Sequence, residues 1–230
     1  MVSDVSSRSR ACRAAPEVVL PERVDGDGGR LREEFNQAVR RPEEFGGLPE
    51  VARLLDRLAA GERRPSGQVW IPDTNARLAP SALLRGSFPD SDTYVIASQY
   101  GEDAHRRGWL RLDRSLTPAE HAAVVDRAVT WTESDRSLPD VLAEFGPPSV
   151  TFGPPDPHRP KTLSYATDDP AAPVVAFHLG SARTDPDPDD RTPPDAVLLA
   201  VRVRDEFLGG WELTPTGVDR FHQRPERASE

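Results

Sequence analysis

Residues 195–204 read DAVLLAVRVR, and this stretch decides the fold class because it is the strongest predicted strand of the C-terminal third. Successive side chains of a strand point to opposite faces of its sheet. One face needs a covering layer of helices, whereas the other, which carries two arginines, is expected to stay half open to solvent. The first face is expected to hold Val197, Leu199, Val201 and Val203, and the second Leu198, Ala200, Arg202 and Arg204.

The segments on either side of this strand predict an antiparallel meander. Runs rich in β-branched and aromatic residues are separated by connectors rich in proline and aspartate. A short run near the C-terminus adds an edge strand. The expected strands are residues 149–152, 161–167, 173–179, 195–204 and 210–215.

Two helices are expected before this meander. The first starts at Thr117, with Glu120 at the third helical position, which is the spacing of a capping box. The second starts after Ser137 and ends at Gly146, and these are preferred residues for the two ends of a helix. The pattern predicts an α+β protein in which helix pairs pack on an antiparallel sheet.

The N-terminal part shows the same order of elements. Residues 31–41 and 48–61 each place apolar side chains on one helical face. Residues 68–72, 93–99 and 108–113 are rich in residues that favour strands, and the last two segments are expected to form a hairpin with a long loop.

Two helix starts echo each other: residues 48–55 read LPEVARLL, and residues 138–145 read LPDVLAEF. Each precedes predicted strands, so the pattern allows two similar ααβββ-type halves. The first residues, which end in DGDGGR, lack a periodic apolar pattern. The expected divisions are a disordered leader at 1–30, an N-terminal half at 31–114, a C-terminal half at 115–220 and a polar tail at 221–230.

The composition bounds the function. The protein of 230 residues has a formal net charge of −9, and the absence of a basic stripe argues against a nucleic-acid partner. Its single cysteine, Cys12, lies in the polar leader. No apolar run approaches the roughly 20 residues of a membrane span, so we expect a cytoplasmic protein without membrane association. Of 29 basic residues only Lys161 is a lysine, a bias typical of a GC-rich bacterial genome.

Residues 48–70 leave DNA binding open as a minor alternative. The phrase EVARLL resembles the first helix of some helix-turn-helix DNA-binding proteins. A recognition helix should follow a short turn, but here GERRPSG leads into a strand-like run.

Residues 181–195, SARTDPDPDDRTPPD, come nearest to a metal-binding motif. An EF-hand calcium loop that began at Asp185 would need glycine and glutamate where Asp190 and Ala196 stand. We therefore expect a solvated connector and no metal. The sequence also lacks the short glycine motifs of nucleophile elbows, phosphate loops and dinucleotide sites, so we assign no catalytic residue and no cofactor.

The candidate binding residues lie on the predicted strands. His178 is expected on the same sheet face as Arg202 and Arg204, with Tyr165 and Trp211 nearby, where they could bind an anion or a peptide. We interpret the protein as a non-enzymatic protein-interaction module, similar in role to an immunity protein or a regulatory adaptor. It would bind a protein partner through its acidic surface and open sheet face. The alternative is an enzyme of hydrolase class that uses dispersed carboxylates and His178.

Overall fold

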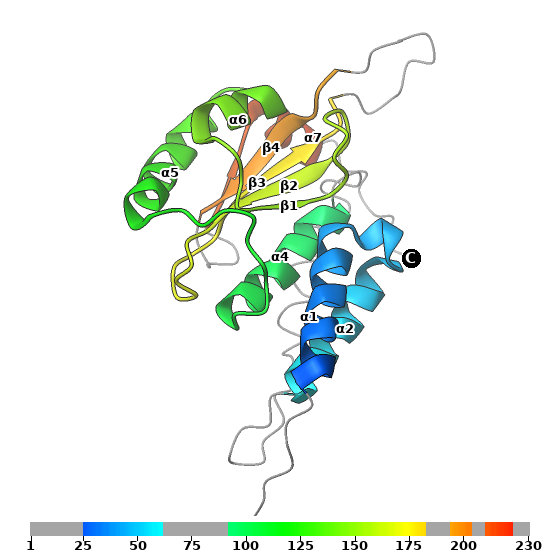
Figure 1. The fold of residues 1–230 in the computed structure, drawn as a ribbon. Coiled ribbons are helices and arrows are strands. Elements are labelled where there is room, and N and C mark those ends of the chain that lie inside the picture. Colours follow the sequence, from blue (N-terminus) through cyan, green and yellow to red (C-terminus); the bar gives the residue numbers. More distant parts are fainter. Residues whose placement is uncertain (1–24, 62–91, 183–193, 204–209, 223–230) are drawn as a thin grey trace, which may run out of the picture.

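The computed structural model describes residues 25–61, 92–182, 194–203 and 210–222, and within them it has an α+β fold, as predicted (Figure 1). The described helices are α1 (Asp25–Arg40), the 3-10 helix η1 (Pro42–Glu44), α2 (Gly47–Gly61), α4 (Asp92–Arg106), α5 (Pro118–Trp131), α6 (Leu138–Phe145) and α7 (Pro215–His222). The described strands are β1 (Val150–Phe152), β2 (Lys161–Tyr165), β3 (Val175–Gly180), β4 (Val197–Arg202) and β5 (Trp211–Leu213).

The described strands form the expected antiparallel meander, in which each strand pairs with the next one in sequence. In the middle of the sheet Leu163 lies opposite Phe177, and Phe177 lies opposite Val201. These three side chains form an apolar row on one face. The row belongs to the core that the sheet shares with α5 and α6.

Helices α5 and α6 begin where the sequence predicts. Thr117 and Glu120 form a capping box at α5, and Ser137 and Asp140 form another at α6, so each helix start is fixed by two reciprocal hydrogen bonds. Aromatic rings then join the helices to the sheet. The ring of Phe145 lies 4.8 Å from that of Phe177 and 5.0 Å from that of Trp131 (centroid to centroid).

A β-bulge interrupts the alternation expected along residues 195–204. The pairing with β3 steps from Ala200 to Leu198, and Leu199 is the additional residue. Leu198 and Val201 therefore face α5 and α6, whereas Leu199 belongs to a separate cluster with Ala200. The prediction that Val197, Leu199, Val201 and Val203 share one face is wrong, because the period of two does not survive an inserted residue.

Helices α1 and α2 lie where the sequence predicts helices, and their apolar stripes are buried. With α4 they form a second core, which also contains Val150 and Phe152 of β1. The N-terminal helices and the sheet therefore share buried surface: β1 contributes to the second core and pairs with β2, whose Leu163 and Tyr165 belong to the first core.

The predicted hairpin of residues 93–99 and 108–113 is wrong. The first segment lies inside α4, and the second is irregular. Helix α4 packs on α1 and α2 through Tyr94 and Ala97, and on the opposite side Glu102 reaches the sheet. A helix buried on two sides has a nearly continuous run of buried residues, which from sequence alone resembles a strand.

The predicted divisions of the sequence differ from the helix ends. Residues 25–30 of the expected leader belong to α1, and residues 221–222 of the expected tail belong to α7. The predicted strand at 68–72 lies outside the described residues. Between residues 31 and 114 the described elements are helical, so a repeat of two ααβββ units is not shown. None of the described helices has the length and apolar character that a membrane crossing requires.

Helix α7 packs against β4 at Gly217, where an added Cβ would lie 1.9 Å from the carbonyl oxygen of Leu199. We expect Gly217→Ala to lower the free energy of unfolding by about 1–3 kcal/mol or more, because this is the usual cost of overpacking. Urea denaturation measures the change. The control is Gly29→Ala in α1, where nothing lies within 4 Å of the added Cβ. This control should be neutral or stabilising by up to about 1 kcal/mol, and an equal loss in both variants would contradict the packing argument.

Candidate functional site

The five predicted site residues lie in different environments. His178, Arg202 and Trp211 share the sheet face that α4 covers, so three of the five come together. Tyr165 lies on the opposite face, in the core with α5 and α6, where its hydroxyl donates to the carbonyl of Gly146 at 2.9 Å. Arg204 lies outside the described residues.

His178 is fully buried. Its Nδ1 lies 2.9 Å from the hydroxyl of Thr162, and its ring stacks on Trp211 with 4.7 Å between centroids and 25° between planes. Burial, and secondarily the positive charge of Arg202, hold the pKa of His178 well below its ordinary value, so the imidazole is neutral. Within the described part of the protein its Nε2 has no hydrogen-bond partner.

Arg202 forms a buried ion pair with Glu102, in which its Nη2 donates to the carboxylate. The carboxylate also accepts a hydrogen bond from Arg106 at 2.7 Å. Glu102 and Arg106 belong to α4, so this network connects the helix to β4. Two buried charges lose most of their hydration, and their mutual attraction must compensate for that loss.

The expectation of an open sheet face is therefore wrong. The face that carries His178 and Arg202 is closed by α4, whose Glu102 neutralises the arginine. An arginine on a predicted strand suggests solvent, because no local pattern reveals a carboxylate from a distant helix that pairs with it. His178 and Arg202 belong to the interior and do not form a docking surface.

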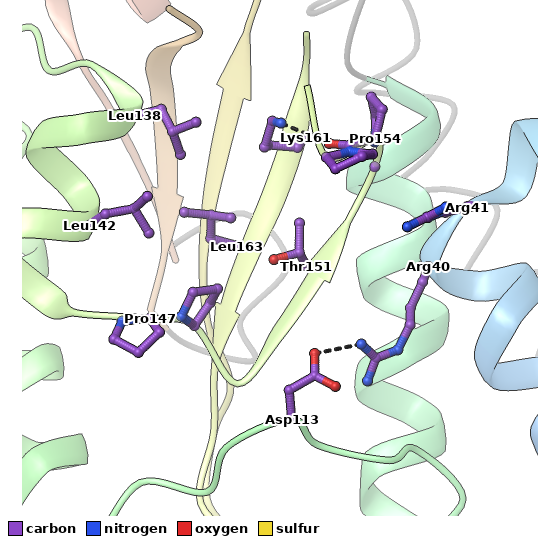
Figure 2. Close-up of a pocket in the computed structure, with 13 residues that line it drawn as sticks. Arg40, Arg41, Asp113, Leu138, Leu142, Pro147, Thr151, Pro154, Lys161 and Leu163 are labelled. Atoms are coloured by element: carbon purple, nitrogen blue, oxygen red, sulfur yellow. Dashed lines mark hydrogen bonds and ion pairs between the residues drawn. The ribbon is translucent and has the colours of Figure 1, made fainter. Parts of the chain in front are cut away.

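A groove with a volume of ≈ 510 Å³ lies at the β1 edge of the sheet (Figure 2). Its two sides come from elements far apart in sequence: α6 lies on one side, and the end of α1 lies on the other. Strands β1 and β2 contribute the residues between them. The groove is lined by Arg40, Arg41, Asp113, Leu138, Leu142, Pro147, Pro148, Thr151, Gly153, Pro154, Pro155, Lys161 and Leu163.

One side of the groove is apolar. Leu138 and Leu142 extend from α6 toward Leu163 of β2, and Pro147 and Pro148 continue this surface after the helix ends. Leu142 is 39% exposed, so part of its apolar surface is accessible from the groove. This side offers apolar surface with little conformational freedom, because the prolines have fixed backbones.

The other side of the groove is cationic. Arg40 donates from Nη1 to Asp113 at 2.6 Å and from Nη2 to the carbonyl of Arg111. Its Nε is buried and has no partner within the described residues. Arg41 is half exposed, and its nearest described carboxylate is that of Glu44, at 3.5 Å. This side therefore carries two guanidinium groups and one carboxylate.

Lys161 is 3% exposed and lines the groove from β2. Its ammonium donates to the carbonyls of Pro154, at 2.8 Å, and Asp156, and it forms no ion pair with the described residues. Burial lowers the pKa of Lys161, which the charge of Asp156 partly opposes. Gly153 allows the backbone to pack over it: its φ is +125°, and a Cβ would lie 2.9 Å from that of Lys161.

Sequence reasoning missed the groove because its residues come from α1, α6, β1, β2 and the turns beside them. Two signals were present: Lys161 is the only lysine of the protein, and proline pairs stand at 147–148 and 154–155. Neither signal indicates spatial proximity. Among the described residues, no group of histidine, cysteine, aspartate or glutamate side chains could hold a metal ion.

The ion pair between Arg202 and Glu102 should contribute strongly to stability. We expect Arg202→Met to lower the free energy of unfolding by about 3 kcal/mol, because it leaves a buried carboxylate with less positive charge nearby. The control is Arg53→Met, which removes a solvent-exposed pair with Glu50 on α2 and should change stability little. Chemical denaturation of both variants measures the difference, and equal effects would show that burial does not strengthen the Arg202 pair.

His178 should make stability depend on pH. Above about pH 6.5 the imidazole is neutral in both the folded and the unfolded protein. Below that pH the unfolded protein takes up a proton that the folded protein refuses, because the pKa of buried His178 is lowered. The free energy of unfolding should therefore fall as pH drops below about 6.5, by up to about 1.4 kcal/mol per pH unit.

The matched variant is His178→Gln, which does not titrate and keeps a polar side chain beside Thr162. Urea denaturation between pH 8 and pH 5 should show that the wild type loses more stability than this variant. Other titrating groups are common to both proteins and cancel in the difference. Parallel pH profiles would contradict the lowered pKa of His178.

Comparison of the sequence and fold with protein-family models, curated proteins and solved structures returned no match. The function is therefore argued from the chemistry of the described residues. Two features provide that chemistry: the groove at the β1 edge, and the buried cluster of His178, Arg202 and Glu102. The described lining of the groove includes exposed residues such as Arg41 and Leu142 beside the buried Leu138, Lys161 and Leu163, whereas the cluster is enclosed by α4.

Proposed function

We propose that this protein is a cytoplasmic protein-interaction module that binds a segment of a partner protein in the groove at the β1 edge. The observation that carries the proposal is the composition of the groove: an apolar side from α6 faces a cationic side at the end of α1. Segments of proteins combine apolar and charged side chains at short spacing, so such a groove can contact both kinds at once.

The size and rigidity of the groove support this proposal. Its ≈ 510 Å³ falls within the range of roughly 300–1,000 Å³ that is usual for ligand sites. The lining residues come from two helices, two strands and proline-rich turns, and the capping box at Ser137 fixes the start of α6. A preformed groove of this kind needs little ordering when it binds, which preserves affinity.

Recognition would rely on side chains more than on strand addition. The outer edge of β1 is flanked by two backbone hydrogen bonds, from the amide of Asp113 to the carbonyl of Ser149 and from the amide of Gly153 to the carbonyl of Arg40. A partner strand would have to displace these bonds in order to pair with β1. A side chain of the partner can contact the exposed part of Leu142 without displacing these backbone hydrogen bonds.

An enzyme remains the second candidate, because His178 lies next to Arg202, whose partner Glu102 supplies a carboxylate. Histidine and carboxylate groups perform proton transfer in many active sites. However, His178 is fully buried, so a substrate would need α4 to move away from the sheet. DNA binding through residues 48–70 gains no support, since the apolar side chains of α2 are buried in the core with α1 and α4 and residues 62–70 lie outside the described part.

The proposal is tested by selecting binders to the full-length protein from a display library of random peptides. Leu142→Glu should weaken the selected peptides about tenfold or more, because a leucine contact in a groove is replaced by a hydrated charge. The control is Val129→Glu, an equally exposed apolar position on α5 that does not line the groove. Isothermal titration of each variant measures affinity. If the peptides bind Leu142→Glu and Val129→Glu as tightly as they bind the wild type, the groove is not the binding site.

A further inference from the structure

The groove contains more positive charge than the described residues neutralise. Among the described residues that line it, three are cations (Arg40, Arg41 and Lys161) and one, Asp113, is a carboxylate. Asp113 forms an ion pair with Arg40 at 2.6 Å, and Glu44, which is not among the described lining residues, forms one with Arg41 at 3.5 Å, so Lys161 is the cation of this set without a described carboxylate at ion-pair distance. The described lining residues therefore have a net charge of +2, on a protein whose formal net charge is −9. Positive charge concentrated in this way attracts an anionic group into the groove.

Lys161 is the part of this set that most needs an anion. An ammonium has three N–H donors, and within the described residues two carbonyls accept from it, which leaves one donor without a partner. Burying a cation without a described carboxylate at ion-pair distance is unfavourable, and the same burial lowers the pKa of Lys161, which the charge of Asp156 only partly opposes. An anion in the groove would remove this cost.

A second donor on the cationic side also lacks an acceptor. The Nε of Arg40 is buried and has no hydrogen-bond partner in the described part of the protein. Buried donors in folded proteins nearly always find a protein or water partner, so an acceptor that a ligand brings into the groove would satisfy donors that the described residues leave unpaired. This observation concerns hydrogen bonding and is independent of the count of charges.

We infer that the groove recognises a carboxylate of the partner segment, which Lys161 and Arg41 hold while the adjacent apolar side chain of that segment packs against Leu142. The inference rests on the proposed function, which it makes specific: the segment is acidic and apolar, with aspartate, glutamate or a terminal carboxylate as its anchor. A carboxylate fits better than a phosphate, because the carboxylate of Asp113 in the lining repels a dianion more strongly and the free donors are few.

The test uses peptides that bind the full-length protein and lose affinity when Leu142 is replaced by glutamate, because such peptides bind in the groove. Each is synthesised in three forms: with its acidic residue, with the corresponding amide (Asp→Asn or Glu→Gln), and with phosphoserine at that position. On the wild-type protein we expect the acidic form to bind about tenfold more tightly than the amide form, as is usual for a charge-assisted contact that loses its charge. Titration calorimetry supplies the dissociation constants.

Two variants locate the preference. Lys161→Met removes the ammonium and retains the apolar part of the side chain. Arg41→Gln removes a guanidinium and leaves the Lys161 ammonium bound to the carbonyls of Pro154 and Asp156. In each variant the affinities of the acidic and amide forms should become nearly equal. The control is Arg53→Gln on α2, which removes an exposed cation that is not among the groove residues and should keep the tenfold preference. Circular dichroism verifies that each variant is folded. If Lys161→Met does not fold, the affinities measured for Arg41→Gln test the inference.

The outcomes separate the two ideas. If the amide form binds the wild type as tightly as the acidic form, the carboxylate inference is wrong and the proposed function stands. Tighter binding of the phosphoserine form also overturns the choice of a carboxylate. If no selected peptide responds to Leu142→Glu, the groove is not the binding site and both ideas fail.

Discussion

The contact between α4 and the sheet is the constraint on which the rest of the fold depends. Helix α4 is buried between α1 and α2 on one side and the strands on the other, so its two sides must meet different surfaces (Figure 1). Tyr94 and Ala97 pack in the helical core, whereas Glu102 meets Arg202 on β4. Charged groups tolerate such burial only when they are paired, so the ion pair fixes the position of α4 on the sheet.

Once α4 is in place, neither face of the sheet is free. Helices α5 and α6 cover the apolar row of Leu163, Phe177 and Val201, and α4 covers the polar face with His178. The accessible chemistry therefore moves to the β1 edge, where α6 and the end of α1 stand on either side of a short strand. The groove lies where β1, which packs in the second core, pairs with β2, which packs in the first core, between the helices that border it.

The charge of the groove differs from that of the whole protein. Several acidic and basic residues of the described surface form ordinary exposed pairs, such as those of Arg30 with Glu34 and Arg111 with Glu33. Such pairs contribute little to stability and leave no net local field. Lys161 is different, because it is buried, pairs with backbone carbonyls and faces no described carboxylate at ion-pair distance. An acidic protein can thus carry a local cationic site.

The sequence by itself determined the local elements. Thr117 and Ser137 mark the starts of α5 and α6, and β-branched runs separated by proline mark the strands, because caps and alternation depend on neighbouring residues. Tertiary structure decided the rest: residues 93–99 became part of a helix, and the bulge at Leu199 reversed an alternation. It also paired Arg202 with Glu102, one hundred residues away, and gathered the groove from separate elements. These outcomes depend on which surfaces meet in space, and no local pattern records that.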